Sequence, residues 1–226
     1  MSKRLTLIAY VLPFALFMVA LVVAEGFRAL GVTHFGDLTL DPMYWVYPVQ
    51  TVVCAAVLLW YWRAYDFGRT NLFNVLMGVG AGLIIFGLWI APQEFFHQPR
   101  RTEGFDPHVI PMVYYWMLAA RLTRLVLVVP LVEEIFWRGF LLRYLVKDDF
   151  SAIPFGNCSK FSFWAVAVGF TAEHAITDWP AAIFTGILLN LVAMQTRSLA
   201  ACVIAHAVAN LALGLYICTT RQWGFW

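Results

Sequence analysis

Three ionisable side chains stand close together in an otherwise apolar stretch of the chain. The segment VVPLVEEIFWRGFLLRYL, residues 128–145, contains Glu133, Glu134 and Arg138. A charged side chain at membrane depth costs several kcal/mol, and such residues commonly mark functional sites. Glu134 and Arg138 are four residues apart, so they can form an ion pair along one helix face. Glu133 points about 100° away from Glu134, so we expect it to project into the helix bundle without that partner.

Two later apolar segments carry histidines at helical spacing. The segment FTAEH holds Phe170 and His174, and the segment HAVAN holds His206 and Asn210. Residues four apart lie on the same face of a helix, so each pair is expected to share a face. Glu173 directly precedes His174, and the helical period turns it to another face. We therefore assign no role to Glu173.

These residue types suit the addition of water to a carbonyl group. A free carboxylate such as Glu133, beside a neutral imidazole such as His174, can act as a general base. A second histidine with an asparagine, His206 with Asn210, can donate hydrogen bonds to a developing oxyanion. The combination favours hydrolysis of a peptide bond. Glu133, His174 and His206 could also hold a metal, but FTAEH lacks the second histidine of an HExxH zinc helix, so no metal or other cofactor is predicted.

The composition indicates that lipid surrounds the chain. Of its 226 residues, 62% are hydrophobic and 12% are charged, whereas soluble domains have about 25% charged residues. The net charge is +2, and Lys and Arg form no basic stripe, so nucleic acid is not an expected partner. The four cysteines have no CxxC spacing, which argues against a zinc cluster and a disulfide framework.

Apolar runs of about 20 residues predict membrane-spanning helices. We expect an all-α polytopic membrane helix bundle of about seven to eight transmembrane helices. The spans are predicted near residues 5–25, 43–62, 71–91, 124–146, 162–178, 180–196 and 199–217. Residues 109–123 form either a separate helix or the start of one long rod with 124–146, kinked at Pro130, where proline removes a backbone donor.

The distribution of Lys and Arg predicts the orientation. These residues gather in the loops on the side of the N-terminus, which favours a cytoplasmic N-terminus. Arg121 and Arg124 fall near the outer interface, where their side chains are expected to reach the lipid headgroups. Regular helices would place Glu133, His174 and Asn210 at a common depth of roughly 20 Å from the inner boundary. The site is expected to open toward the inner face or sideways to lipid.

The three motifs EEIFWR, FTAEH and HAVAN resemble, in this order, the EExxxR, FxxxH and HxxxN motifs of the CPBP family. This family comprises CAAX prenyl endopeptidases and related bacteriocin-processing membrane proteins. The resemblance covers roughly residues 125–215 and implies an all-helical, glutamate-dependent intramembrane protease that needs no metal. It implies that Glu133 and His174 activate water and that His206 and Asn210 form the oxyanion site.

The remaining motif positions are Glu134, Arg138 and Phe170, the first two as an ion pair and the third in a packing role. The resemblance divides a single membrane domain, residues 1–226, into generic N-terminal spans at 1–108 and CPBP-like catalytic helices at 109–217. The implied substrate is a membrane-associated protein or peptide, lipid-modified in some relatives, that is cut near a C-terminal CAAX-like tail.

The chain also resembles the CAAX-protease-related proteins that accompany bacterial exosortase (PEP-CTERM) sorting systems. This likeness implies a sorting system of that kind as a partner and a bacterial inner membrane as the location. Three alternatives stay open at the level of the sequence. They are a non-catalytic immunity or scaffold protein of the same fold, a metal-dependent variant, and a proton-coupled carrier, for which a paired inverted repeat would be expected.

Overall fold

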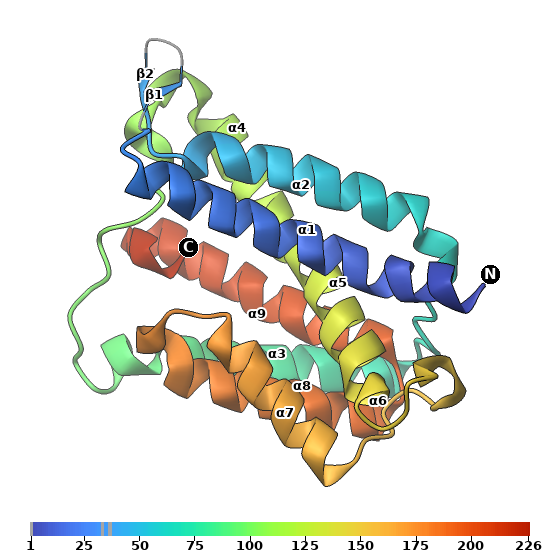
Figure 1. The fold of residues 1–226 in the computed structure, drawn as a ribbon. Helices are drawn as coiled ribbons and strands as arrows, with labels where there is room; N and C mark the ends of the chain where they lie inside the picture. Colours follow the sequence, from blue (N-terminus) through green and yellow to red (C-terminus); the bar gives the residue numbers. More distant parts are fainter. Residues whose placement is uncertain (1, 33, 36–37) are drawn as a thin grey trace.

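The computed structural model describes residues 2–32, 34–35 and 38–226, and it is a bundle of α-helices (Figure 1). The longer helices are α1 (Lys3–Ala29), α2 (Met43–Trp60), α3 (Leu72–Glu94), α7 (Lys160–Ala172), α8 (Trp179–Thr196) and α9 (Leu199–Thr220). Two strands of two residues each, β1 (His34–Phe35) and β2 (Leu38–Thr39), form a small antiparallel hairpin between α1 and α2. The prediction of an all-α membrane bundle is confirmed.

Residues 114–144 form one long helical rod, which we call the central rod. It runs through α4 (Tyr114–Thr123), a π-helical segment (Arg124–Val128), α5 (Val129–Glu134), a second π-helical segment (Ile135–Leu141) and α6 (Leu142–Tyr144). The rod alternative for residues 109–146 is therefore the one that the structure adopts. Pro130 lies in the first turn of α5, directly after the first π-helical segment. There the amide of Val129 donates to the carbonyl of Arg124, five residues back, so the helix widens just before the proline.

Five helical segments are long and apolar enough to cross a membrane, among the residues that the structure describes. They are α1, α2, α3, α8 extended to Ile176, and α9. The predicted span 162–178 is wrong at its end, because α7 has 13 residues and stops at Ala172, which gives a length of about 20 Å. A short 3₁₀ turn, Ile176–Asp178, then leads into α8, where Pro180 takes an early position that needs no amide donor.

The helices pack closely where glycines face a neighbouring backbone. A Cβ on Gly78 or Gly82 of α3 would lie 2.8 Å from the carbonyl oxygen of Ala201 or 2.5 Å from that of Ala205, both in α9. Small residues at a helix interface allow this close approach in membranes. The glycines of α3 therefore fix the position of α9, which carries His206 and Asn210.

The central rod lies in the middle of this arrangement. Figure 1 shows α1 and α2 side by side, with the rod crossing behind α1 toward α6, and α7 and α8 on the far side of α9. The rod packs against α1 and α2 on one side and against α9 on the other. Its middle part is consequently covered by protein, and Val132, Glu134, Ile135 and Arg138 are fully buried.

Candidate active site

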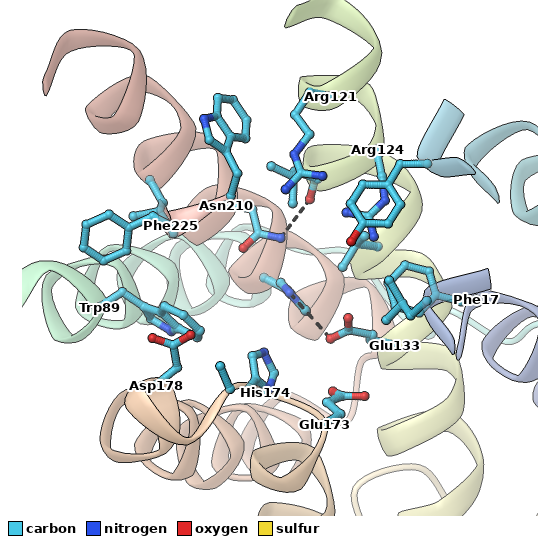
Figure 2. A pocket seen from close by; sticks show the side chains of 18 of the residues that line it. Phe17, Trp89, Arg121, Arg124, Glu133, Glu173, His174, Asp178, Asn210 and Phe225 are labelled. Carbon is cyan, nitrogen blue, oxygen red and sulfur yellow. Dashed lines mark hydrogen bonds and ion pairs between the residues drawn. The ribbon is translucent and has the colours of Figure 1, made fainter. Parts of the chain in front are cut away.

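A cavity of about 920 Å³ lies between the central rod, α9, the second half of α1 and the turn that joins α7 to α8 (Figure 2). Its lining includes Glu133, Glu173, His174, His206 and Asn210. The structure thus brings four predicted catalytic residues to one cavity, from the central rod, the turn after α7, and α9. Phe170 lines the same cavity, whereas Glu134 and Arg138 lie behind its wall.

The predicted ion pair between Glu134 and Arg138 is present. Nη1 of Arg138 lies 3.0 Å from Oε1 of Glu134, and both side chains are completely buried. The same guanidinium donates to Oδ1 of Asn190 at 3.1 Å and to the carbonyl of Gly186 at 3.2 Å, both in α8. Its centre stacks 4.9 Å from the ring centroid of Phe170. Arg138 is therefore fully used in joining the rod to α7 and α8.

Asn190 is a structural residue of the site that sequence reasoning missed. Its Oδ1 accepts from Arg138, and its Nδ2 donates to the carbonyl of Phe163 in α7 at 2.9 Å. The signal was available, because Asn190 is a lone amide in the middle of the predicted span 180–196, and polar side chains there commonly join helices.

His206 connects the two glutamates. Its Nδ1 lies 2.9 Å from Oε1 of Glu134 and its Nε2 lies 3.9 Å from Oε2 of Glu133. Oε1 of Glu134 also accepts from Arg138, so it acts as a carboxylate acceptor, and Nδ1 of His206 must carry the proton. Nε2 is then the nitrogen that faces Glu133. Oε2 of Glu133 is buried and has no hydrogen-bond partner in the structure.

His174 lies outside the regular helix on which it was predicted. It follows the end of α7, in the turn before α8, and its ring packs 4.9 Å from Phe170 and 5.5 Å from Trp89 between centroids. Nδ1 lies 2.8 Å from the carbonyl of Phe170. A carbonyl only accepts, so Nδ1 is the protonated nitrogen, and Nε2 keeps its lone pair when the ring is neutral.

Asn210 is held by the π-helical part of the rod. Its Nδ2 donates to the carbonyl of Leu125 at 2.8 Å, and Leu125 lies within the segment Arg124–Val128. An amide nitrogen has two N–H groups. One N–H of Asn210 is thus used in fixing the side chain, and the second is available on the cavity side.

The prediction that Glu173 faces away from His174 is wrong. Glu173 also lines the cavity, its Oε1 accepts from Nε1 of Trp137 at 3.1 Å, and its Oε2 is buried without a hydrogen-bond partner. The reason is that α7 ends at Ala172. The rotation of 100° per residue does not apply in the turn that follows.

The expectation that Arg121 and Arg124 reach the headgroups is also wrong. Their exposed fractions are 4% and 6%, and both line the cavity. The central rod lies inside the bundle, so a position near the outer end of this helix does not face lipid. Figure 2 shows both arginines at the end of the cavity that is remote from His174 and Glu173.

The cavity reaches the surface between α1 and the turn after α7. The exposed lining residues there include Val22 and Glu25 in α1 and Ala175 in the turn. These α1 residues belong to the half of the helix that is remote from Lys3. These exposed lining residues therefore lie away from the N-terminal side, where one of the two expectations placed the opening.

Metal-ligand geometry gives no further candidate. In residues 2–32, 34–35 and 38–226, no group of three or more His, Cys, Asp or Glu side chains is arranged to hold a metal ion.

Comparison with known families concerns the second half of the chain. Residues 115–212 match the family model described as type II CAAX prenyl endopeptidase Rce1-like. This region, which is less than half of the chain, is similar to that family. No curated protein and no solved structure gives a significant match to the chain. The five long apolar helices indicate an integral membrane protein.

The matched region, residues 115–212, contains every motif residue, from Glu133 to Asn210, and the two buried arginines of the cavity. Other parts of the cavity wall lie outside it, among them Phe17 in α1, Trp89 in α3 and Trp226 at the end of the chain. The family is one of CAAX proteases, which supports protease activity at the level of the family.

Proposed function

We propose that the chain is an intramembrane endopeptidase that hydrolyses a peptide bond in a membrane-associated protein or peptide, with Glu133 and His174 activating the water. The observation that carries the proposal is the unequal use of two adjacent glutamates. Glu134 is fully buried and bound by Arg138 and His206. Oε2 of each glutamate is buried without a hydrogen-bond partner, but only Glu133 lines the cavity, beside His206.

In this mechanism a water molecule binds between Glu133 and Nε2 of His174. Glu133 takes one proton, and the water oxygen forms a bond to the carbonyl carbon of the substrate. The tetrahedral intermediate collapses when the carbon–nitrogen bond breaks. Glu133 then returns the proton to the departing amine. The carbonyl of Phe170, which holds Nδ1 of His174, keeps the lone pair of Nε2 directed at the water.

His206 and Asn210 stabilise the oxyanion of the intermediate. Because Nδ1 of His206 is bound to Glu134, Nε2 can donate a hydrogen bond only when the ring is an imidazolium. Glu133 and Glu134 both lie beside the ring and favour the imidazolium electrostatically. The second N–H of Asn210 is the other donor. Donors fixed in advance at such a position commonly contribute about 10²–10³ in rate.

Glu134 and Arg138 position other side chains of the site. Glu134 sets the tautomer of His206, and Arg138 holds both Glu134 and the Phe170 ring. This division gives each member of the EExxxR motif a distinct task.

The proposal also covers the position of the cut, the membrane, the orientation of the chain and its partner. The substrate is cut near a C-terminal CAAX-like tail, the membrane is a bacterial inner membrane, and the N-terminus lies in the cytoplasm. An exosortase-type sorting system is the partner that the sequence resemblance names. The exposed apolar side chain of Val22 in the cavity lining supports entry of a substrate from the lipid phase.

The test compares the C-termini of membrane proteins in cells that produce the wild-type chain or Glu133→Gln at equal levels. Glu133→Gln keeps the shape of the side chain but removes the base, so C-termini that arise by cleavage should appear only with the wild type. Mass spectrometry of C-terminal peptides measures this. Identical profiles, with the two proteins equally abundant, would contradict proteolysis and favour a non-catalytic scaffold.

A further inference from the structure

Two buried cations share the cavity with the proposed catalytic residues. Arg121 and Arg124 follow the same side of the central rod as Glu133, and all three line the cavity. Figure 2 shows the two guanidiniums together at one end, with Glu133 between them and His174. In the described part of the chain, neither arginine forms an ion pair with an acidic side chain.

Aromatic rings and one amide surround these guanidiniums. Nε of Arg124 donates to Oε1 of Gln50 at 2.8 Å, and its centre lies 4.5 Å from the ring centroid of Tyr47. Arg121 lies 5.0 Å from the ring of Phe105 and 5.4 Å from that of Trp226. Rings attract a cation through their faces, but they supply no acceptor in line with its N–H groups.

Much of the hydrogen-bonding capacity of Arg121 is therefore unused. Its Nε and Nη1 are buried and have no partner in the structure. Buried polar groups in native proteins are nearly always satisfied, and a buried charge is stable only with a counter-charge or with hydrogen bonds. Arg121 lacks a counter-charge and partners for these two atoms, and Arg124 has no counter-charge and only the hydrogen bond to Gln50. Two adjacent cations in this state indicate a site for an anionic ligand.

We propose that Arg121 and Arg124 bind the terminal carboxylate of the peptide substrate. The inference rests on the proposed endopeptidase function. A guanidinium presents two parallel N–H donors that match the two oxygens of a carboxylate. The rings of Tyr47 and Trp226 stand beside the guanidiniums at this end of the cavity. A polypeptide that ended there would place its charge on the arginines without having to continue past these rings.

The distance along the rod between the two arginines and Glu133 fits a short C-terminal peptide as the leaving group. Arg124 and Arg121 precede Glu133 by 9 and 12 residues, which corresponds to about 13–18 Å along a helix. An extended peptide advances about 3.3 Å per residue. A few residues are thus enough to join a bond held at Glu133 to a carboxylate held at the arginines.

The experiment measures binding separately from cleavage. The protein with Glu133→Gln, in detergent micelles, is titrated with a dansyl-labelled apolar hexapeptide that ends in a free carboxylate, and with the same peptide as a C-terminal amide. The acid should bind about tenfold or more tightly than the amide, as expected for a charge-assisted bidentate contact. Equal affinities would overturn the proposal, and this comparison needs no change to the arginines.

Arginine variants then test which side chains bind the carboxylate of the peptide. Arg121→Gln and Arg124→Gln should each reduce the acid-to-amide ratio. Arg124→Lys keeps the charge but loses the planar fork, so it should keep part of the ratio. Arg100→Gln removes the same charge from an exposed position outside the cavity and should keep the whole ratio. An unchanged ratio in both arginine-to-glutamine variants would contradict the assignment.

Two further outcomes separate the possible failures. If phospholipid copurifies with the wild type but not with the arginine variants, and acid and amide bind equally, the arginines hold a lipid phosphate and the proposal is wrong. If the acid binds selectively but the wild type cleaves nothing, the carboxylate site stands and the proposed protease activity fails. If the wild type cleaves acid and amide equally well, the protease stands and the carboxylate site fails.

Discussion

Adjacent glutamates have opposite tasks in this site because a helix turns them to different surroundings. Glu134 faces Arg138 and His206 in the protein interior. Glu133 faces the cavity, where its Oε2 has no hydrogen-bond partner. The side chain of Glu134 is therefore used in structural contacts, and the side chain of Glu133 stays available to a ligand or a water molecule.

The loss of Arg138 should destabilise the fold. Arg138→Ala leaves Glu134 buried without its cationic partner, and removal of one member of a buried ion pair commonly costs about 3–5 kcal/mol. We expect a clearly lower midpoint of thermal unfolding in detergent. Glu133→Gln serves as the control, because it breaks no hydrogen bond of Oε2 and should unfold near the wild-type temperature. Equal losses in the two variants would show that the division of roles between the glutamates is wrong.

Asn190 gives a second prediction at this scale. Asn190→Ala removes the acceptor for Nε of Arg138 and the donor for the carbonyl of Phe163, so it should lower the free energy of unfolding by about 1–3 kcal/mol. Denaturation of the purified variant measures this. Gln195→Ala removes an exposed amide from the same helix and should change little. A neutral Asn190→Ala would mean that the bridge between the rod, α7 and α8 does not stabilise the protein.

At the scale of the elements, helix packing decides where the catalytic side chains lie. The glycines of α3 admit the backbone of α9, and the π-helical segment of the rod presents the carbonyl of Leu125 to Asn210. The short α7 places Glu173 and His174 in a turn, so both side chains point into the cavity although they are neighbours in the sequence.

A methyl group at the α3–α9 interface should disturb the site. In Gly82→Ala the new Cβ would lie 2.5 Å from the carbonyl oxygen of Ala205, so α9 must move, and overpacking of this kind costs about 1–3 kcal/mol. Thermal unfolding and cleavage should both suffer. Gly80→Ala is the matched control, because a Cβ at Gly80 meets nothing within 4 Å. If the two variants behaved alike, close contact between α3 and α9 would not hold His206 in place.

The sequence predicted elements better than it predicted their ends. Hydropathy identified α1, α2, α3, α8 and α9, because each has an apolar run of membrane length. It could not show that α7 stops at Ala172, since no glycine or proline follows before Pro180 to mark the end of a helix. Nor could it show that the rod is covered by protein, and this is why Arg121 and Arg124 were expected at the headgroups.

At the scale of the whole molecule, the site combines a family region with walls from elsewhere in the chain. Glu133, His174, His206 and Asn210 could be chosen from the sequence, because their motifs lie within residues 115–212, which match the family model. The wall residues Phe17, Trp89 and Trp226 could not, because no spacing in the sequence relates α1, α3 and the chain end to each other. Only the packing of the bundle brings them to one cavity.

Contacts between two segments that are distant in the sequence build the far end of the cavity. Arg101, in the segment after α3, stacks 4.6 Å from the ring of Phe225, and its carbonyl accepts from the amide of Gly224. These contacts hold the end of the chain, with Trp226, against Arg121. Neither segment has a periodic pattern, so such pairings become visible only in the structure.

The proposed mechanism depends most on Glu133 as the base, although Glu173 also presents a buried carboxylate oxygen to the cavity. The most direct measurement compares the rate at which C-termini are generated in membranes that contain wild type, Glu133→Gln or Glu173→Gln at equal levels. We expect Glu133→Gln to lose cleavage and Glu173→Gln to retain most of it. Cleavage that persists in Glu133→Gln would contradict the proposed mechanism.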